Sequence, residues 1–141
     1  LDWLDAKLGE NASPGKPVFV FLHQPLMNTT AGSMESQKWY GVSQDAELKA
    51  VLSKHRQAIL FTGHGHWELE AERNYYDGED RLPAMFNAAS VAYLWTDEDE
   101  RKEGSQGYYV EVYEDRVLVR GRDFAAGAWV ESARFEVPLR S

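Results

Sequence analysis

The sequence of 141 residues contains no cysteine, which excludes disulfide bonds, cysteine nucleophiles and thiolate zinc sites. It also lacks an uninterrupted apolar run of the roughly 18 residues that a membrane-spanning helix requires, so we expect no transmembrane segment. Positive charge is scarce, because 15 basic side chains oppose 23 acidic ones and leave a net charge of −8. Such a surface repels phosphate backbones, so we expect no broad nucleic-acid-binding patch.

The chain begins without an initiating methionine and without a signal peptide. Leu1, Leu4 and Leu8 recur at helical spacing, which predicts an amphipathic helix at the very start. A protein that opens inside a helix is expected to be a piece of a longer one. The length and a hydrophobic content of 43% suit one domain with a real core, which we place over residues 1–141.

Two apolar runs, 17–22 and 58–61, are typical of strands buried on both faces of a sheet. Between them, Ser43 can cap a helix that continues to about residue 55. The order strand, helix, strand predicts one parallel crossover and an α/β fold, a mixed sheet with flanking helices. A long polar loop is expected over 26–42.

Beyond residue 66 the pattern changes to one typical of antiparallel strands. We expect short strands over 67–72 and 84–86, a hairpin of 108–113 and 116–120 around Glu114–Asp115, and a last strand over 129–139. The charged segment 97–103 is expected to be a solvated loop without a chemical role.

Three of the four histidines follow the two apolar runs directly. His23 comes after 17–22, and His64 and His66 come after 58–61, where open α/β sheets build their sites. An isolated H-x-H pair is often an ordinary loop, but neutral imidazole is also the commonest metal ligand. Because parallel neighbouring strands end at the same edge, we predict that the three histidines cluster there and bind metal.

Other candidate residues carry weaker signals. Trp39 and Tyr40 can line a substrate pocket from the long loop, although anchoring the loop to the core is an equal alternative. Asn87 follows the strand 84–86 and can face the same site. His55 is expected to have a structural role and not to bind metal, because a cation at a helix carboxyl end complements the helix dipole.

Two histidine motifs resemble those of the calcineurin-like metallophosphoesterase family. Val20–Pro25 is similar to the family's V-x-x-H-x-P element, and Thr62–His66 is similar to its G-H-x-H element. The resemblance implies a four-layer α/β/β/α sandwich that hydrolyses phosphate mono- or diesters at a dinuclear metal site. It implies that His23 and His64 bind one ion and His66 the other. Divalent Mn, Fe or Zn suits such a ligand set.

The family elements D-x-H, G-D-x-x-D and G-N-H-[DE] do not occur in this sequence. By resemblance, the chain is therefore the C-terminal half of such a domain, and its first partner is the missing N-terminal half. We expect the isolated chain to be inactive. We also expect one face of the strands 17–22 and 58–61 to be uncovered and to form a homodimer interface.

Two other functions stay open at this point. One is a non-catalytic metal-binding or interaction module that reuses the half-fold. The other is a purely structural β-rich domain with surface histidines.

Overall fold

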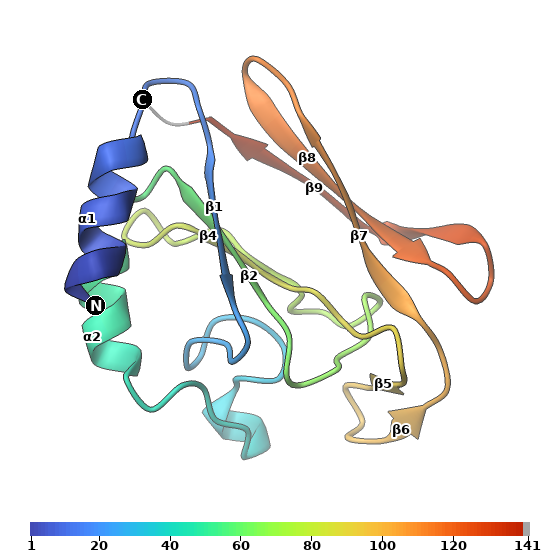
Figure 1. The fold of residues 1–141 in the computed structure, drawn as a ribbon. Helices are drawn as coiled ribbons and strands as arrows, with labels where there is room; N and C mark the ends of the chain where they lie inside the picture. The colour runs from blue at the N-terminus through green and yellow to red at the C-terminus, as the bar shows by residue number, and fades with distance from the viewer. Residues whose placement is uncertain (140–141) are drawn as a thin grey trace.

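The computed structural model describes residues 1–139, which form a mixed α/β fold made mostly of strands (Figure 1). The elements, in chain order, are α1 (Asp2–Asn11), β1 (Val18–Leu22), the 3₁₀ helix η1 (Glu35–Gln37), α2 (Asp45–Leu52), β2 (Ala58–Thr62), β3 (Tyr75–Tyr76), β4 (Ala84–Asn87), β5 (Leu94–Trp95), β6 (Arg101–Lys102), β7 (Gln106–Val112), β8 (Arg116–Asp123) and β9 (Ala128–Pro138). No helix among the described residues is long and apolar enough to cross a membrane.

The first sheet has the strand order β1-β2-β4-β3. β1 and β2 are parallel, with Val20 opposite Leu60, which confirms the predicted crossover through α2. β4 is also parallel to β2, and only β3 is antiparallel within this sheet. The expected change to antiparallel pairing directly after residue 66 was therefore wrong. The first sheet takes a third parallel strand, because the chain from β2 returns through a long connection before it enters β4.

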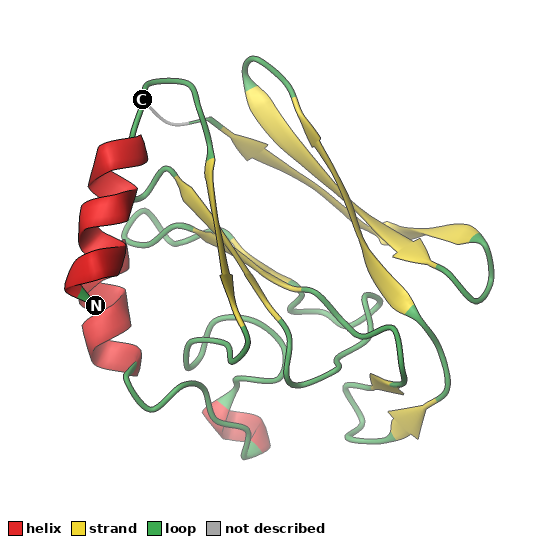
Figure 2. Ribbon diagram, viewed as in Figure 1, coloured by secondary structure: helices red, strands yellow, loops and turns green. Residues whose placement is uncertain are grey.

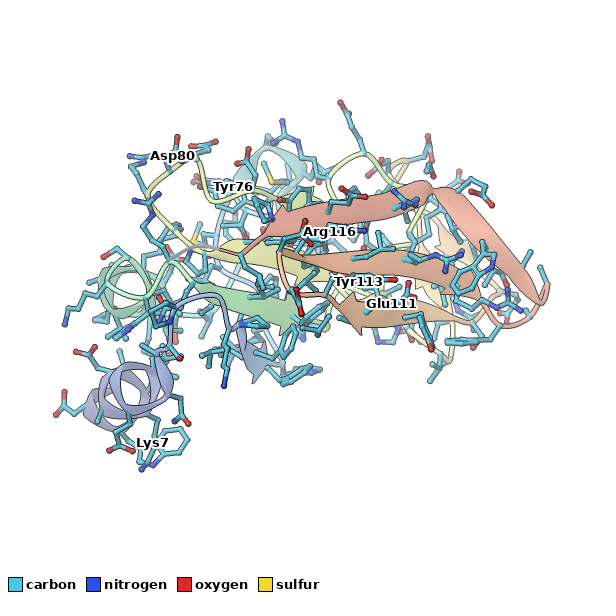
Figure 3. All side chains as sticks on the ribbon, turned by 90° about the horizontal axis from the view of Figure 1, so that it is seen from above. Lys7, Tyr76, Asp80, Glu111, Tyr113 and Arg116 are labelled. Atoms are coloured by element: carbon cyan, nitrogen blue, oxygen red, sulfur yellow. The ribbon has the colours of Figure 1, made fainter. Side chains whose placement is uncertain are left out.

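Alternate residues of β2 face two different layers, as the pleat of a strand requires. Leu60 packs among apolar side chains of α1 and α2, such as Leu8 and Leu52. Ile59 and Phe61 pack on the other face, against the second sheet. Figures 2 and 3 show this arrangement, with both helices on one side of the first sheet and β7–β9 on the other.

This packing corrects the expectation that one face of residues 58–61 is bare. Every residue of β2 is buried, because β8 and β9 of the same chain cover the face that we expected to form an interface. The apolar surface of the two strands that stays exposed lies on the edge strand β1, where 77% of Phe21 is accessible to solvent. The homodimer stays a prediction, but β2 cannot supply its interface without unpacking.

The second sheet has the order β7-β8-β9 and is antiparallel throughout. The predicted hairpin is confirmed, since Val112 pairs with Val117 around Glu114–Asp115. In Figure 3, the labelled Glu111, Tyr113 and Arg116 mark this end of the sheet. The four-layer sandwich stays a prediction.

The strand expected over 67–72 is absent, and the segment forms turns instead. The alternation of buried side chains along this segment is nevertheless present, because Trp67, Leu69 and Ala71 are all buried. The backbone N–H of Leu69, however, donates to the Gln106 side chain, and Trp67 makes only one isolated bridge, with Trp95. A period-two pattern of burial therefore arose here in a segment that pairs with strand β5 at Trp67 alone.

Helix α2 is shorter than predicted. It begins after Gln44 rather than at a Ser43 cap and ends at Leu52 rather than near residue 55. His55 lies beyond the helix, and its Nε2 is 2.6 Å from Oδ1 of Asp5 in α1. The helix-dipole interpretation of His55 is thus replaced by a specific side-chain contact with Asp5 that ties α1 to the turn after α2.

Candidate metal centre

The parallel pairing of β1 and β2 brings two of the predicted metal ligands to one edge of the sheet. Leu22 lies opposite Thr62 at the carboxyl ends of the two strands, and His23 directly follows Leu22. The N–H of Gly63 donates to the carbonyl oxygen of His23 over 3.0 Å. This bond extends the ladder by one step and places His64 beside His23.

The two imidazoles face each other closely. Nδ1 of His64 is 3.2 Å from Nε2 of His23, and the ring planes are inclined at 84°. Two nitrogens bound to a tetrahedral zinc ion, each at about 2.0–2.1 Å, lie roughly 3.3–3.4 Å apart. The pair therefore fits two neighbouring positions of one ion, and the same distance also suits an N–H···N hydrogen bond between the rings.

His66 is held apart from this pair. Its Nδ1 is 3.2 Å from the carbonyl oxygen of Tyr93, and its ring lies 4.3 Å from the Tyr93 ring. A histidine that donates from Nδ1 to a carbonyl keeps Nε2 free as a ligand, which is the usual arrangement of metal-bound histidines. Over residues 1–139, no group of three or more His, Cys, Asp or Glu side chains is placed to hold an ion. The structure thus joins His23 to His64, and metal binding by the three histidines stays a prediction.

Three of the eight non-glycine residues with positive φ in the described part of the chain lie at this edge. His64 and His66 have φ of 68° and 58°, and Ala89, just after β4, has φ of 58°. The left-handed conformation costs a non-glycine residue about 1–2 kcal/mol, and such strain is found preferentially at functional sites. Between the two histidines, Gly65 approaches Gly32 so closely that a Cβ atom would lie 3.1 Å from the Gly32 Cα. The segment 63–66, called the histidine loop below, is therefore held in place by packing.

Trp39 anchors the long loop to the core, the alternative that the sequence left open. Its ring contacts Trp67 edge-on at 4.9 Å, and its Nε1–H donates to Asp99 over 3.2 Å. Asp97 and Asp99 also accept the indole N–H groups of Trp67 and Trp95. The segment 97–103 is exposed, as expected of a solvated segment, and two of its aspartates accept hydrogen bonds from three buried or half-buried indoles.

Tyr40 and Asn87 lie in opposite environments. Tyr40 is 59% exposed, whereas Asn87 is 1% exposed. The Asn87 amide donates to the carbonyl of Trp67 and to the side chain of Asn74, so both of its hydrogens are used inside the protein. A substrate contact by Asn87 would require this network to open. Substrate binding by Trp39, Tyr40 and Asn87 stays a prediction.

A cleft of about 560 Å³, which no pattern in the sequence predicts, opens beside the histidine pair. Most of its lining residues come from β1 and β2 of the first sheet and from β7 of the second, with β1 and β7 as edge strands. Figure 1 shows the course of these strands. The lining residues of the cleft are Phe19, Phe21, Leu22, His23, Phe61, Thr62, Gly63, Ala88, Tyr108 and Val110. Burial raises the pKa of the Tyr108 phenol, so this hydroxyl stays neutral. The two walls come from segments far apart in the chain, and only the folded structure brings them together.

Comparisons with protein-family models, with curated proteins and with solved structures find no match for this chain. Its resemblance to the calcineurin-like metallophosphoesterases therefore rests on sequence motifs, and the family assignment stays a prediction.

Proposed function

We propose that this chain is part of a metal-dependent phosphoesterase that hydrolyses phosphate mono- or diesters. His23 and His64 hold one divalent ion, and His66 holds a second through Nε2. The observation that carries the proposal is the pair of imidazole nitrogens 3.2 Å apart at the carboxyl ends of two parallel strands. The two motifs that resemble the metallophosphoesterase family support the choice of phosphate esters as substrates.

The side chains of this chain have distinct tasks in the proposed site. His23 and His64 bind as neutral imidazoles, while the Tyr93 carbonyl fixes the tautomer and the orientation of His66. The strained turn of the histidine loop sets the direction of both ring systems before any ligand arrives. Divalent ions at such a site polarise a phosphoryl oxygen and make a bound water nucleophilic at neutral pH.

Three histidines are too few donors for a catalytic pair of ions. Two-metal sites hold their ions about 3.5–4 Å apart, which requires bridging and terminal ligands besides these imidazoles. The remaining ligands in the proposal are carboxylate and amide groups from a polypeptide segment outside these 141 residues, the N-terminal half implied by the resemblance. The isolated chain should therefore turn over phosphate esters at a negligible rate.

The test is hydrolysis of a chromogenic phosphodiester in the presence of Mn²⁺ or Zn²⁺. One tube holds the purified chain alone, and a parallel tube also holds the segment encoded upstream. We expect turnover only in the second tube and expect the variant His64→Ala to abolish it. Strong metal-dependent turnover by the pure chain would show that the donor count was misjudged. No turnover in either tube would contradict the proposed activity.

A second candidate is a non-catalytic module that binds one metal ion. It is favoured by the fact that only His23 and His64 are in contact, while His66 packs against Tyr93. Calorimetric titration separates the two, because this module binds one ion per chain with or without the upstream segment. The phosphoesterase reading requires a second ion once that segment is added.

A further inference from the structure

The cleft between β1 and β7 has a polar end and an apolar body. At one end it reaches His23 and Gly63, next to the imidazole pair. Its walls are otherwise dominated by aromatic and aliphatic side chains, including Phe19, Phe61 and Val110. A volume of about 560 Å³ falls within the range of roughly 300–1,000 Å³ that is typical of small-molecule sites.

The charge of the lining sets the cleft apart from the rest of the molecule. The chain carries a net charge of −8, yet no aspartate or glutamate is among the described residues that line the cleft. Among the described residues that line the cleft, His23 is the only one with a basic side chain, and its imidazole can hold a metal cation. An anionic group can therefore approach this end of the cleft without facing a carboxylate, in contrast to most of the surface.

The apolar body is open to a ligand rather than closed by the protein's own packing. Phe21 stacks on Phe61 with ring centroids 5.7 Å apart, but 77% of Phe21 is exposed. On the opposite wall, Val110 is 37% exposed. Covering these side chains removes apolar surface from water, which stabilises a complex. The favourable contact requires an apolar group that is continuous with the group at the histidines.

We infer that this cleft binds the apolar group of an organic phosphate whose phosphoryl group lies at His23 and His64. The substrate class is then a phosphoester that carries an alkyl or aryl substituent, rather than a small polar phosphate. The position of the phosphoryl group in this inference rests on the proposed function. The position of the apolar group rests on the cleft alone.

The test uses three probes against the zinc-loaded chain in calorimetric titrations: hexyl phosphate, inorganic phosphate and hexanol. We expect hexyl phosphate to bind about tenfold or more tightly than either of the other two, because it alone fills both ends of the site. The variant Val110→Trp fills the cleft and should lower the affinity for hexyl phosphate to that of inorganic phosphate. Val112→Trp is the matched control, since Val112 lies on the same strand but outside the lining, and it should leave the affinity unchanged.

A second variant, Phe21→Ser, removes one wall of the cleft at a mostly exposed position. It should also lower the affinity for hexyl phosphate, so the test stays decisive if Val110→Trp does not fold. Zinc binding without preference for hexyl phosphate would overturn the inference and leave the proposed function standing. Equal binding of hexyl phosphate and hexanol would overturn the placement of the phosphoryl group. Light scattering that shows a dimer in the parent chain and a monomer in Val110→Trp would also overturn the inference, by giving the cleft to a second copy. Absence of zinc binding would count against the proposed function. In that case, failure of both hexyl phosphate and hexanol to bind the metal-free chain would overturn the inference too.

Discussion

Nδ1 of His64 lies 3.2 Å from Nε2 of His23, although 41 positions of sequence separate the two residues. The contact exists because β1 and β2 are parallel neighbours in register, so that the residues just past their carboxyl ends meet. The separation of the nitrogens fits two ligand positions of one tetrahedral ion.

The first prediction concerns metal affinity. His23→Ala and His64→Ala should each lower the affinity for Zn²⁺ at least tenfold, or about 1.4 kcal/mol, because each removes one of two adjacent donors. Isothermal titration calorimetry measures the effect. His55→Ala is the control, since His55 pairs with Asp5 away from the centre. If His55→Ala weakened zinc binding as much as His64→Ala, the metal would lie elsewhere.

The second prediction compares the same substitution at two phenylalanines. Phe86 is fully buried and packs on Phe61 and Tyr75, so Phe86→Ala should destabilise the fold by about 3–5 kcal/mol. Phe21 is 77% exposed, and Phe21→Ala should change the free energy of unfolding by less than about 0.5 kcal/mol. Urea unfolding followed by tryptophan fluorescence gives both values. A cost above 2 kcal/mol for Phe21→Ala, on the order of a core substitution, would show that Phe21 is covered in solution.

The third prediction concerns the histidine loop. A Cβ atom at Gly65 would lie 3.1 Å from the Gly32 Cα and 3.5 Å from the Trp67 ring, so Gly65→Ala should cost about 1–3 kcal/mol. At Gly63 the nearest atom is the His23 carbonyl oxygen, 4.0 Å away, and Gly63→Ala should be nearly neutral. Thermal and urea unfolding of the two variants provide the comparison. Equal stability of both variants would mean that the loop does not pack against Gly32.

The fourth prediction concerns acid stability. Hydrogen bonds from Lys54 and His55 lower the pKa of Asp5 below its ordinary value. A carboxylate with a depressed pKa in the folded state contributes stability above its unfolded-state pKa of about 3.9, and this contribution is lost as the pH falls through the folded-state value. The difference in unfolding free energy between the parent chain and Asp5→Asn should therefore be constant near pH 5 and shrink below about pH 4.

Denaturant titrations between pH 5 and pH 2 test this dependence. Asp2→Asn, on the same helix, is the control for a general effect of helix charge. A difference between the parent chain and Asp5→Asn that does not change over this range would exclude the proposed linkage.

The sequence by itself determined the parallel strands and the edge at which the histidines lie. The apolar run 58–61 is buried on both faces, as its pattern predicts, and the helix before it makes a parallel crossover from 17–22. Burial of 17–22 on both faces was wrong, because β1 is an edge strand on which Phe21 is exposed. The alternation of 108–113 and 116–120 around Glu114–Asp115 likewise specified a hairpin. These signals are local, because each depends on the spacing of side chains within one element.

Only the tertiary structure decided which of the candidate site residues lie together and which are held apart. The Tyr93 carbonyl holds His66 away from His23, and the hydrogen bonds of Asn87 to Trp67 and Asn74 bury a side chain that the sequence placed at the site. The cleft is also a tertiary feature, because its walls come from different sheets. Such contacts join residues that lie far apart in the chain, and their formation depends on packing geometry that no local pattern of residues encodes.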